Sequence, residues 1–342
     1  MTDLKLVTQQ QTPISIVLGW LTRFRSRHAS WIPVFAALAI LVFMFGFAQW
    51  WFGNFLTPRL ISTLLLDNAY LLVLAVGMTF VILTGGIDLS VGSVMAFTGI
   101  LCASVIAQGV PAAVAVPLMI LSGAAIGLLI GVLVHYFDVQ PFIASLVGMF
   151  LARGLAFLVS LRSIKIEDPA ILWLQSERFT FEGWYITPTG IIALLVVVAG
   201  VLILQFTRFG RTIYAIGGNE QSARLMGLPV VRTKILAYVI SGVCGGLAGL
   251  VLIAYQGAGY PLNGTGAELD TIAAVVIGGT LLTGGSGYVI GSMIGVFVYG
   301  TIAIVISFLG AEQSWKRIIV GALLLLFVVV QRLIVSRSSR RT

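Results

Sequence analysis

Charged residues are scarce in this chain. Only 9% of its 342 residues are Asp, Glu, Lys or Arg, whereas 59% are hydrophobic and the mean hydropathy is +1.07. A soluble domain of this length needs many more polar residues to cover its surface. The composition therefore excludes a soluble globular protein and indicates a polytopic membrane protein.

The residues that hydrolytic, metal and nucleotide sites need are also few. Cys102 and Cys244 sit in apolar runs without metal-ligand spacing, and His28 and His135 have no nucleophile or metal partner at motif spacing. None of the four lysines follows a glycine, as the lysine of a phosphate-binding loop does. The sequence thus predicts no catalytic residue, no metal and no nucleotide cofactor in this chain.

Hydrophobic runs of about 20 residues, the length that crosses a bilayer, predict an all-α fold with about ten transmembrane helices. The runs lie at about residues 31–52, 59–84, 90–108, 112–134, 141–160, 189–206, 234–255, 267–283, 287–309 and 316–333. The eighth is short for a span and is also compatible with a re-entrant segment. The first is full length, and the N-terminus lacks a short apolar segment with a small-residue cleavage site, which favours a span over a cleaved signal.

Positive charges gather in three stretches: an N-terminal segment 1–30, a loop 207–234 and a C-terminal tail 336–342. Between the two ends lies a transmembrane domain, 31–335. Ten spans place all three stretches on one side, which the excess of Lys and Arg makes cytoplasmic. The net charge of +8 therefore reflects membrane orientation and does not indicate nucleic-acid binding.

Glycine-rich interruptions recur at a constant offset of 199 residues. Thr84-Gly85-Gly86 and Gly92-Ser93 reappear as Thr283-Gly284-Gly285 and Gly291-Ser292. Matched breaks of this kind are typical of discontinuous helices around a transported solute. The alternative is that these small residues only allow helices to pack closely. The span count favours a parallel relation between the two motifs, which one re-entrant segment would invert.

Polar side chains near the breaks are candidates for lining a solute pathway, because they are costly in lipid. They are Asn68, Thr79, Thr84, Asp88, Ser90, Ser93, Thr280 and Thr283. The alternative for Asp88 and Ser90 is a cap on a helix that starts at Val91. For Arg153 we expect a structural pair with a carboxylate, and for Glu268 and Asp270 capping at the outer interface.

The loop 207–234 is too long for a simple turn. Asn219 can cap a helix start, Ala223 and Arg224 favour helix, and Gly227 followed by Pro229 ends it. A short amphipathic helix is therefore predicted on the cytoplasmic face. The alternative is a helix that merely lies among the lipid headgroups.

The breaks and the loop resemble the permease subunits of monosaccharide ATP-binding cassette importers, the ribose, xylose and galactose group. The resemblance covers residues 60–333 and rests on Val76–Thr79, Thr84–Ser93, Ile277–Gly285, Arg208–Gly210, Tyr214–Asn219 and Ala223–Gly227. Within that group, Leu66–Ala69, Ala96–Gly99, Leu325–Phe327 and Gln331-Arg332 resemble most a galactofuranose importer permease.

The resemblance implies a permease that imports sugar across the bacterial inner membrane and has three kinds of partner. A cytoplasmic ATPase, which binds the ATP, would dock on the coupling loop 207–234 through Asn219, Glu220, Ala223, Arg224 and Gly227. A second permease, either a paralogue or a copy of this chain, would complete the pathway. A periplasmic or lipid-tethered binding protein would deliver a neutral sugar.

Two other functional classes remain open at this point. An ion-coupled secondary transporter also uses paired broken helices, and Asp88 could then serve a coupling ion. A scaffold or channel without pumping is the third class, although the absence of a ring of charged filter residues disfavours an ion channel.

Overall fold

The computed structural model describes residues 31–312 and 314–339, and these are mainly helical. The predicted N-terminal segment 1–30 and the last residues of the predicted tail, 340–342, lie outside the described residues. The helices are α2 Ile32–Phe52, α3 Pro58–Leu83, α4 Val91–Ala107, α5 Ala112–Tyr136, α6 Pro141–Val159, α7 Pro169–Ser176, α8 Pro188–Phe206, α9 Arg208–Gly218, α10 Glu220–Leu225, α11 Val230–Gln256, α12 Ala267–Ile277, α13 Val289–Phe308 and α14 Ser314–Ser339.

A helix occupies each of the ten hydrophobic segments predicted from the sequence. Within the described residues, seven helices have the length and hydropathy to cross a membrane: α2, α3, α5, α6, α8, α11 and α13. The apolar helix α4 is shorter, at 17 residues. The eighth segment forms only the 11-residue α12, because Gly278 and Gly279 end the helix where Gly279 takes a φ of +96°.

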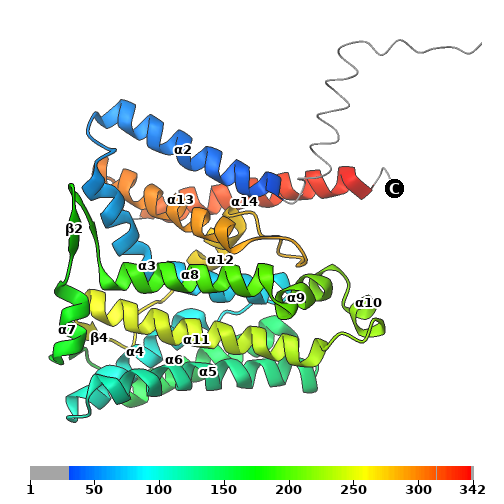
Figure 1. Cartoon of the computed structure of the whole chain (residues 1–342), viewed down its shortest axis with the longest axis horizontal. Helices are drawn as coiled ribbons and strands as arrows, with labels where there is room; N and C mark the ends of the chain where they lie inside the picture. Colours follow the sequence, from blue (N-terminus) through cyan, green and yellow to red (C-terminus); the bar gives the residue numbers. More distant parts are fainter. Residues whose placement is uncertain (1–30, 313, 340–342) are drawn as a thin grey trace, which may run out of the picture.

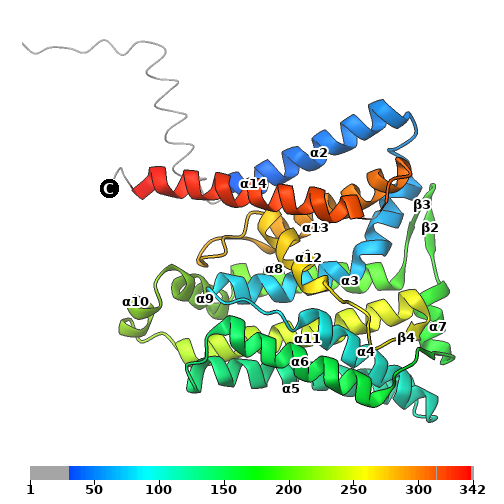
Figure 2. The same ribbon diagram turned by 180° about the vertical axis from the view of Figure 1, so that it is seen from behind.

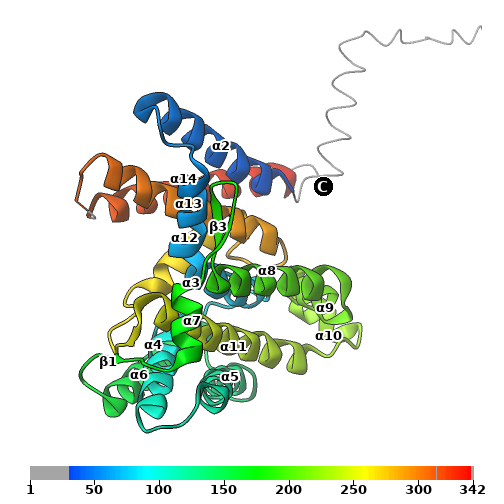
Figure 3. The same ribbon diagram turned by 60° about the vertical axis from the view of Figure 1, so that its left-hand side comes forward.

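The long helices lie side by side as an elongated array (Figure 1). α9 and α10 project from one end, and α7 and the strands β2 and β3 lie at the other. Figure 2 shows the same arrangement from behind, and the oblique view in Figure 3 places α2 and α5 on opposite sides of the array. The chain is thus a multi-pass membrane protein with its extramembrane helices segregated to the two ends.

Close helix packing is achieved with small residues at the centre of the array. A Cβ at Gly77 of α3 would lie 2.8 Å from Cys244 Cβ of α11. Gly123 of α5 and Gly242 of α11 are in backbone contact. Since lipid gives helices no hydrophobic reason to associate, such close approach supplies the van der Waals contact that holds them together.

Four short strands depart from the all-α expectation. β1 Ile164–Lys165 pairs with β4 Ala258–Gly259, and β2 Phe179–Phe181 forms a hairpin with β3 Trp184–Ile186. The hairpin is fastened to α3, because Tyr185 N donates to Ser62 Oγ at 3.0 Å and the Tyr185 and Thr63 hydroxyls are 2.7 Å apart. Strands of two or three residues carry no periodicity that sequence reasoning can detect.

Candidate functional site

The first glycine break is a turn held by its own polar groups. α3 ends before Thr84, whose hydroxyl donates to Val81 O at 2.7 Å, and Gly85 turns the chain with a φ of +82°. Asp88, only 1% exposed, accepts from Ser90 N at 2.9 Å and from Ser90 Oγ at 2.6 Å. Asp88 therefore stabilises the turn before α4, but the predicted cap does not form, because the side chain of the N-cap residue Ser90 accepts no hydrogen bond from the first turn of the helix.

Asp88 also ties this turn to the centre of the array. Its second oxygen, Oδ2, accepts from Ser241 Oγ of α11 at 2.7 Å. The buried Tyr238 hydroxyl, one turn earlier on α11, lies where a Cβ on Gly86 would be, at 2.5 Å, and has no hydrogen-bond partner among the described residues. Both carboxylate oxygens are satisfied by protein groups, as burial of the charge requires.

The second break follows α12 and contains a denser run of glycines. Gly279, Gly284, Gly285 and Gly287 all have positive φ, between +73° and +150°. Gly278 is in backbone contact with Gly291 at the start of α13. Only residues without a Cβ adopt these angles without strain, which explains why the break is built from glycine.

The two breaks meet each other. Gly285 N donates to Leu83 O at 3.0 Å, and a Cβ on Gly284 would lie 2.8 Å from Gly85 N. Leu83 and Gly285 are 202 positions apart in the sequence, yet their main chains are hydrogen-bonded. The matched glycines thus serve a direct contact between the breaks, not only separate turns.

The helix α9 joins the same place from the 207–234 loop. Tyr214 OH donates to Gly287 O at 2.8 Å. A Cβ on Gly217 would meet Leu83 O and Gly285 N, both closer than any real Cβ contact. We call this three-way contact of residues 83–85, 214–218 and 284–287 the glycine junction.

The 207–234 loop contains two helices where the sequence predicted one. The predicted helix is α10: Asn219 Oδ1 accepts from Ser222 N at 2.8 Å, and Gly227 follows its end with a φ of +72°. The additional helix, α9, begins at Arg208 and is capped by Thr207, whose hydroxyl accepts from Gly210 N at 3.1 Å. The cap at Asn219 and the stop at Gly227 are confirmed, whereas α9 was missed.

Glu220 holds α10 against α11 as the acceptor for two cations. Its carboxylate lies 2.6 Å from Arg224 Nη2 and 2.8 Å from Lys234 Nζ. Partial burial alone would raise the pKa of Glu220, but the hydrogen bonds and charges of Lys234 and Arg224 outweigh it and hold the pKa below its ordinary value. Ala223 is buried in a small apolar cluster with Ile216 and Val230. These contacts connect α10 rigidly to α9 and α11.

The remaining hydroxyl candidates lie within helix packing. The Thr79 and Ser292 hydroxyls, on α3 and α13, are 2.7 Å apart and both buried. Ser93 is buried in the first turns of α4, and Thr280 is buried in the second break with a hydroxyl that has no partner among the described residues. Thr283 is exposed. The candidates therefore cluster along the α3–α13 contact and the junction, and their role in a pathway stays a prediction.

Asn68 lies apart from the junction. Its side-chain amide donates to Leu64 O at 2.9 Å and packs where a Cβ on Gly300 of α13 would be. Asn68 is thus placed about four helical turns from Leu83 along α3, by the 3.6-residue period. The structure does not bring it to the same site as the residues of the breaks.

Arg153 interacts electrostatically with Glu268, but among the described residues it forms no direct ion pair with a carboxylate. Its Nη1 donates to Pro261 O at 2.6 Å and to Asn263 O at 2.9 Å, both in the segment before α12. The ion pairs among the described residues are Lys165–Glu167, Arg224–Glu220 and Lys234–Glu220. Two main-chain carbonyls satisfy the guanidinium at a fixed geometry, so it anchors this loop on α6. Glu268 and Asp270 lie in the first turn of α12, where acids favour the helix dipole.

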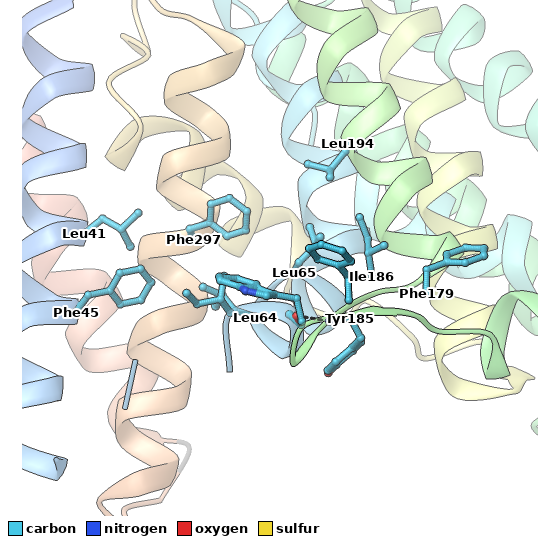
Figure 4. Close-up of a pocket in the computed structure, with 13 residues that line it drawn as sticks. Leu41, Phe45, Leu64, Leu65, Phe179, Tyr185, Ile186, Leu194 and Phe297 are labelled. Atoms are coloured by element: carbon cyan, nitrogen blue, oxygen red, sulfur yellow. Dashed lines mark hydrogen bonds between the residues drawn. The ribbon is translucent and has the colours of Figure 1, made fainter. Parts of the chain in front are cut away.

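An apolar cavity of about 340 Å³ lies between α2, α3, α8, α13 and the β2–β3 hairpin (Figure 4). Its lining includes Leu41, Phe45, Leu65, Phe179 and Phe297. Of its few polar groups, Ser62 Oγ already accepts from Tyr185 N. A sugar hydroxyl would find almost no partners here, so this cavity does not match a polar solute.

Comparisons with known proteins agree on one class. A family model described as branched-chain amino acid transport system, permease component, matches residues 60–328. The chain is 44% identical over 304 residues to the inner membrane ABC transporter permease protein YjfF of Escherichia coli, covering 88% of this chain and 92% of the relative. No solved structure matches the chain.

Two further relatives are named as sugar permeases. The fructose import permease protein FruG of Bifidobacterium longum is 43% identical over 321 residues, which cover 89% of this chain and 92% of the relative. The ribose import permease protein RbsC of Escherichia coli is 38% identical over 309 residues, which cover 88% and 94%.

Proposed function

Since the chain belongs to this family of membrane transport permeases, we propose that it forms the translocation pathway of an ATP-binding cassette importer for a neutral monosaccharide. The sugar is of the pentose, hexose or hexofuranose class, with galactofuranose as the specific candidate. Relatives named for ribose, fructose and arabinose support the sugar class.

The glycine junction is the observation that carries this proposal. The helix α9 touches both breaks at once, through Tyr214 on Gly287 and through Gly217 between Leu83 and Gly285. A displacement of α9 and α10 must therefore move the ends of α3 and α12 together. A permease whose movement is powered by a separate ATPase subunit needs this linkage between the ATPase-binding helices and the translocation pathway.

The exposed tip of α10 supports a protein partner at that end. Leu225 and Met226 are 84% and 66% exposed and directly follow the exposed Arg224. Apolar side chains presented in this way on an extramembrane loop are typical of a docking surface. We propose that the ATPase subunit covers them and that the loop, with both chain termini, is cytoplasmic.

The other partners follow from the same proposal. A second permease, a paralogue or a copy of this chain, completes the pathway, and a sugar-binding protein docks at the end that carries α7 and the β2–β3 hairpin. Ten membrane segments, including α4, α12 and α14, complete the topology.

Substitution of Gly227 tests the proposal in the assembled importer. Valine at a φ of +72° is strained and should displace the tip of α10, whereas asparagine tolerates this conformation. We expect Gly227→Val to lose most ATP-driven uptake of labelled sugar into vesicles while the protein stays folded, and Gly227→Asn to keep it. ATP-driven uptake equal to wild type in Gly227→Val would contradict coupling through this loop.

The energy source separates this proposal from an ion-coupled secondary transporter, which the comparisons do not favour. Asp88, the residue proposed for a coupling ion, has both carboxylate oxygens bonded by Ser90 and Ser241. Uptake that follows a sodium or proton gradient without the ATPase subunit would overturn the ATP-driven proposal.

A further inference from the structure

A group of polar and aromatic side chains from five helices converges away from the glycine junction. Its members are Asp67 and Tyr70 of α3, Tyr255 of α11, Asp270 of α12, Tyr299 of α13 and Lys316 of α14. We call it the tyrosine–carboxylate cluster. Tyr255 lies in the last turn of α11, whose first turn adjoins α10, so the cluster belongs to the half of the molecule remote from the loop 207–234.

Direct contacts define the cluster. Tyr255 OH donates to Asp67 Oδ1 at 3.1 Å, and Tyr299 interacts electrostatically with Asp270. Lys316 Nζ lies 4.0 Å from the centre of the Tyr299 ring. Tyr70 is within electrostatic range of Asp67, Tyr255 and Asp270 and so links the two tyrosine–carboxylate pairs. The six side chains therefore form one continuous group.

The carboxylates have more hydrogen-bonding capacity than the protein uses. Asp67 and Asp270 take part in none of the ion pairs found among the described residues. An ionised carboxylate accepts several hydrogen bonds, and Asp67 has the Tyr255 hydroxyl as its side-chain donor in this cluster. Ionisable side chains in membrane segments are costly and mark functional positions.

Access distinguishes this group from the residues of the breaks. Tyr255 is 43% exposed, and Asp67, Tyr70 and Asp270 are half-buried. By contrast, Thr79, Ser90 and Asp88 are buried and bonded to other protein groups. The side chains of the cluster are therefore partly accessible, whereas those groups are enclosed and already bonded to other protein groups.

We propose that the tyrosine–carboxylate cluster is a binding site for the neutral sugar during translocation, an inference that rests on the proposed function. Carboxylates accept from sugar hydroxyls, and tyrosine rings offer apolar faces to the carbon-bound hydrogens of a sugar ring. The Lys316 ammonium and the Arg317 guanidinium are both within electrostatic range of the cluster, so two cations balance its two carboxylates, as suits a neutral solute.

The first test uses the complete importer, with its ATPase and binding protein, in vesicles. D-ribose, L-arabinose, D-fructose and D-galactose serve as probes. We expect Asp67→Asn to lower the maximal uptake rate of the transported sugar about tenfold, as loss of a hydrogen bond to a charged group does, and Tyr255→Phe to lower it less. ATP hydrolysis by the assembled complex should persist in both variants.

Asp138→Asn and Tyr136→Phe are the matched controls, because both residues lie at the end of α5 away from the cluster. Wild-type uptake in both cluster variants would overturn the sugar site and leave the proposed function standing. Failure of the wild-type importer to take up any probe with ATP would instead count against the proposed function.

A second measurement decides the matter if the cluster variants fail to assemble. Gln256→Cys places a thiol next to Tyr255 without altering the cluster, and the two native cysteines are buried. The transported sugar should slow the reaction of this thiol with a maleimide in the purified chain, while leaving the reaction of Leu225→Cys on α10 unchanged. Labelling of Gln256→Cys that is indifferent to all four sugars would overturn the site.

Discussion

At the glycine junction, Gly217 has no room for a methyl group. A Cβ on Gly217 would overlap Leu83 O and Gly285 N, which are main-chain atoms and cannot swing aside, whereas Gly218 has nothing within 4 Å. We predict that Gly217→Ala destabilises the protein by about 1–3 kcal/mol and lowers uptake, and that Gly218→Ala does neither. Thermal unfolding in detergent and vesicle uptake measure the two effects. Equal stability of the two variants would refute the tight contact.

The hydroxyl of Tyr214 carries a side-chain hydrogen bond from α9 to Gly287 O in the second break. Burial, and to a smaller extent Tyr288, raises the pKa of Tyr214 to about 12, so the phenol keeps its proton and donates throughout the physiological pH range. We predict that Tyr214→Phe costs about 1 kcal/mol and lowers the amount of sugar moved per ATP hydrolysed. Tyr136→Phe is the control, and an unchanged ratio in Tyr214→Phe would contradict the prediction.

The sequence predicted some residue roles and missed others for a physical reason. Asn219 as a helix start follows from local spacing, which fixes short-range hydrogen bonds, whereas Asp88 bonds Ser90 N in the turn before α4 and does not cap the helix. The bonding of Arg153 to Pro261 O and Asn263 O depends on how distant segments pack, and main-chain acceptors leave no trace in residue type. The same holds for the contact of Leu83 with Gly285.

At the scale of elements, the attachment of α10 depends on the charge of Glu220. Because its folded pKa lies below its ordinary value of 4.5, the ion pairs are complete at neutral pH and are lost as the pH falls through the lowered pKa. We predict that amide exchange in residues 219–227 is constant from pH 8 to pH 5, after correction for intrinsic rates, and rises in more acidic buffer.

Glu220→Gln should remove that acid-dependent rise and loosen α10 at every pH, by about 0.5 kcal/mol as for other partly exposed pairs. Glu167→Gln is the control, since its pair with Lys165 lies next to α7, at the end of the molecule opposite α10. Exchange that begins to rise above pH 5 in the wild type would mean that another group holds α10.

Helix positions were predictable because a bilayer requires long apolar runs, and each of the ten runs contains a helix. The length of α12 was not predictable in this way, because the apolar run continues past Gly278 although the helix ends there. α9 was also missed, because its glycines and basic residues resemble a loop until the buried Ile213 and Ile216 are seen against their neighbours.

At the scale of the whole molecule, the proposed orientation predicts opposite accessibility of the two ends. Ser163→Cys, in the segment between α6 and β1, should react with an impermeant maleimide in intact cells. Gly218→Cys should react only after the membrane is permeabilised. The buried Cys102 and Cys244 keep the background low. Labelling of Gly218→Cys in intact cells would invert the topology and remove the ATPase from the loop 207–234.

The glycine junction is made almost wholly of main-chain atoms, and this has a consequence for how such permeases can diversify. A contact made by main-chain atoms does not depend on which side chains occupy the rest of α3, α12 and α13. Substitutions at the end of these helices opposite the junction can then change substrate specificity without altering the contact with α9. Chimeras that exchange only that end between homologous permeases should remain coupled to the same ATPase while transporting a different solute.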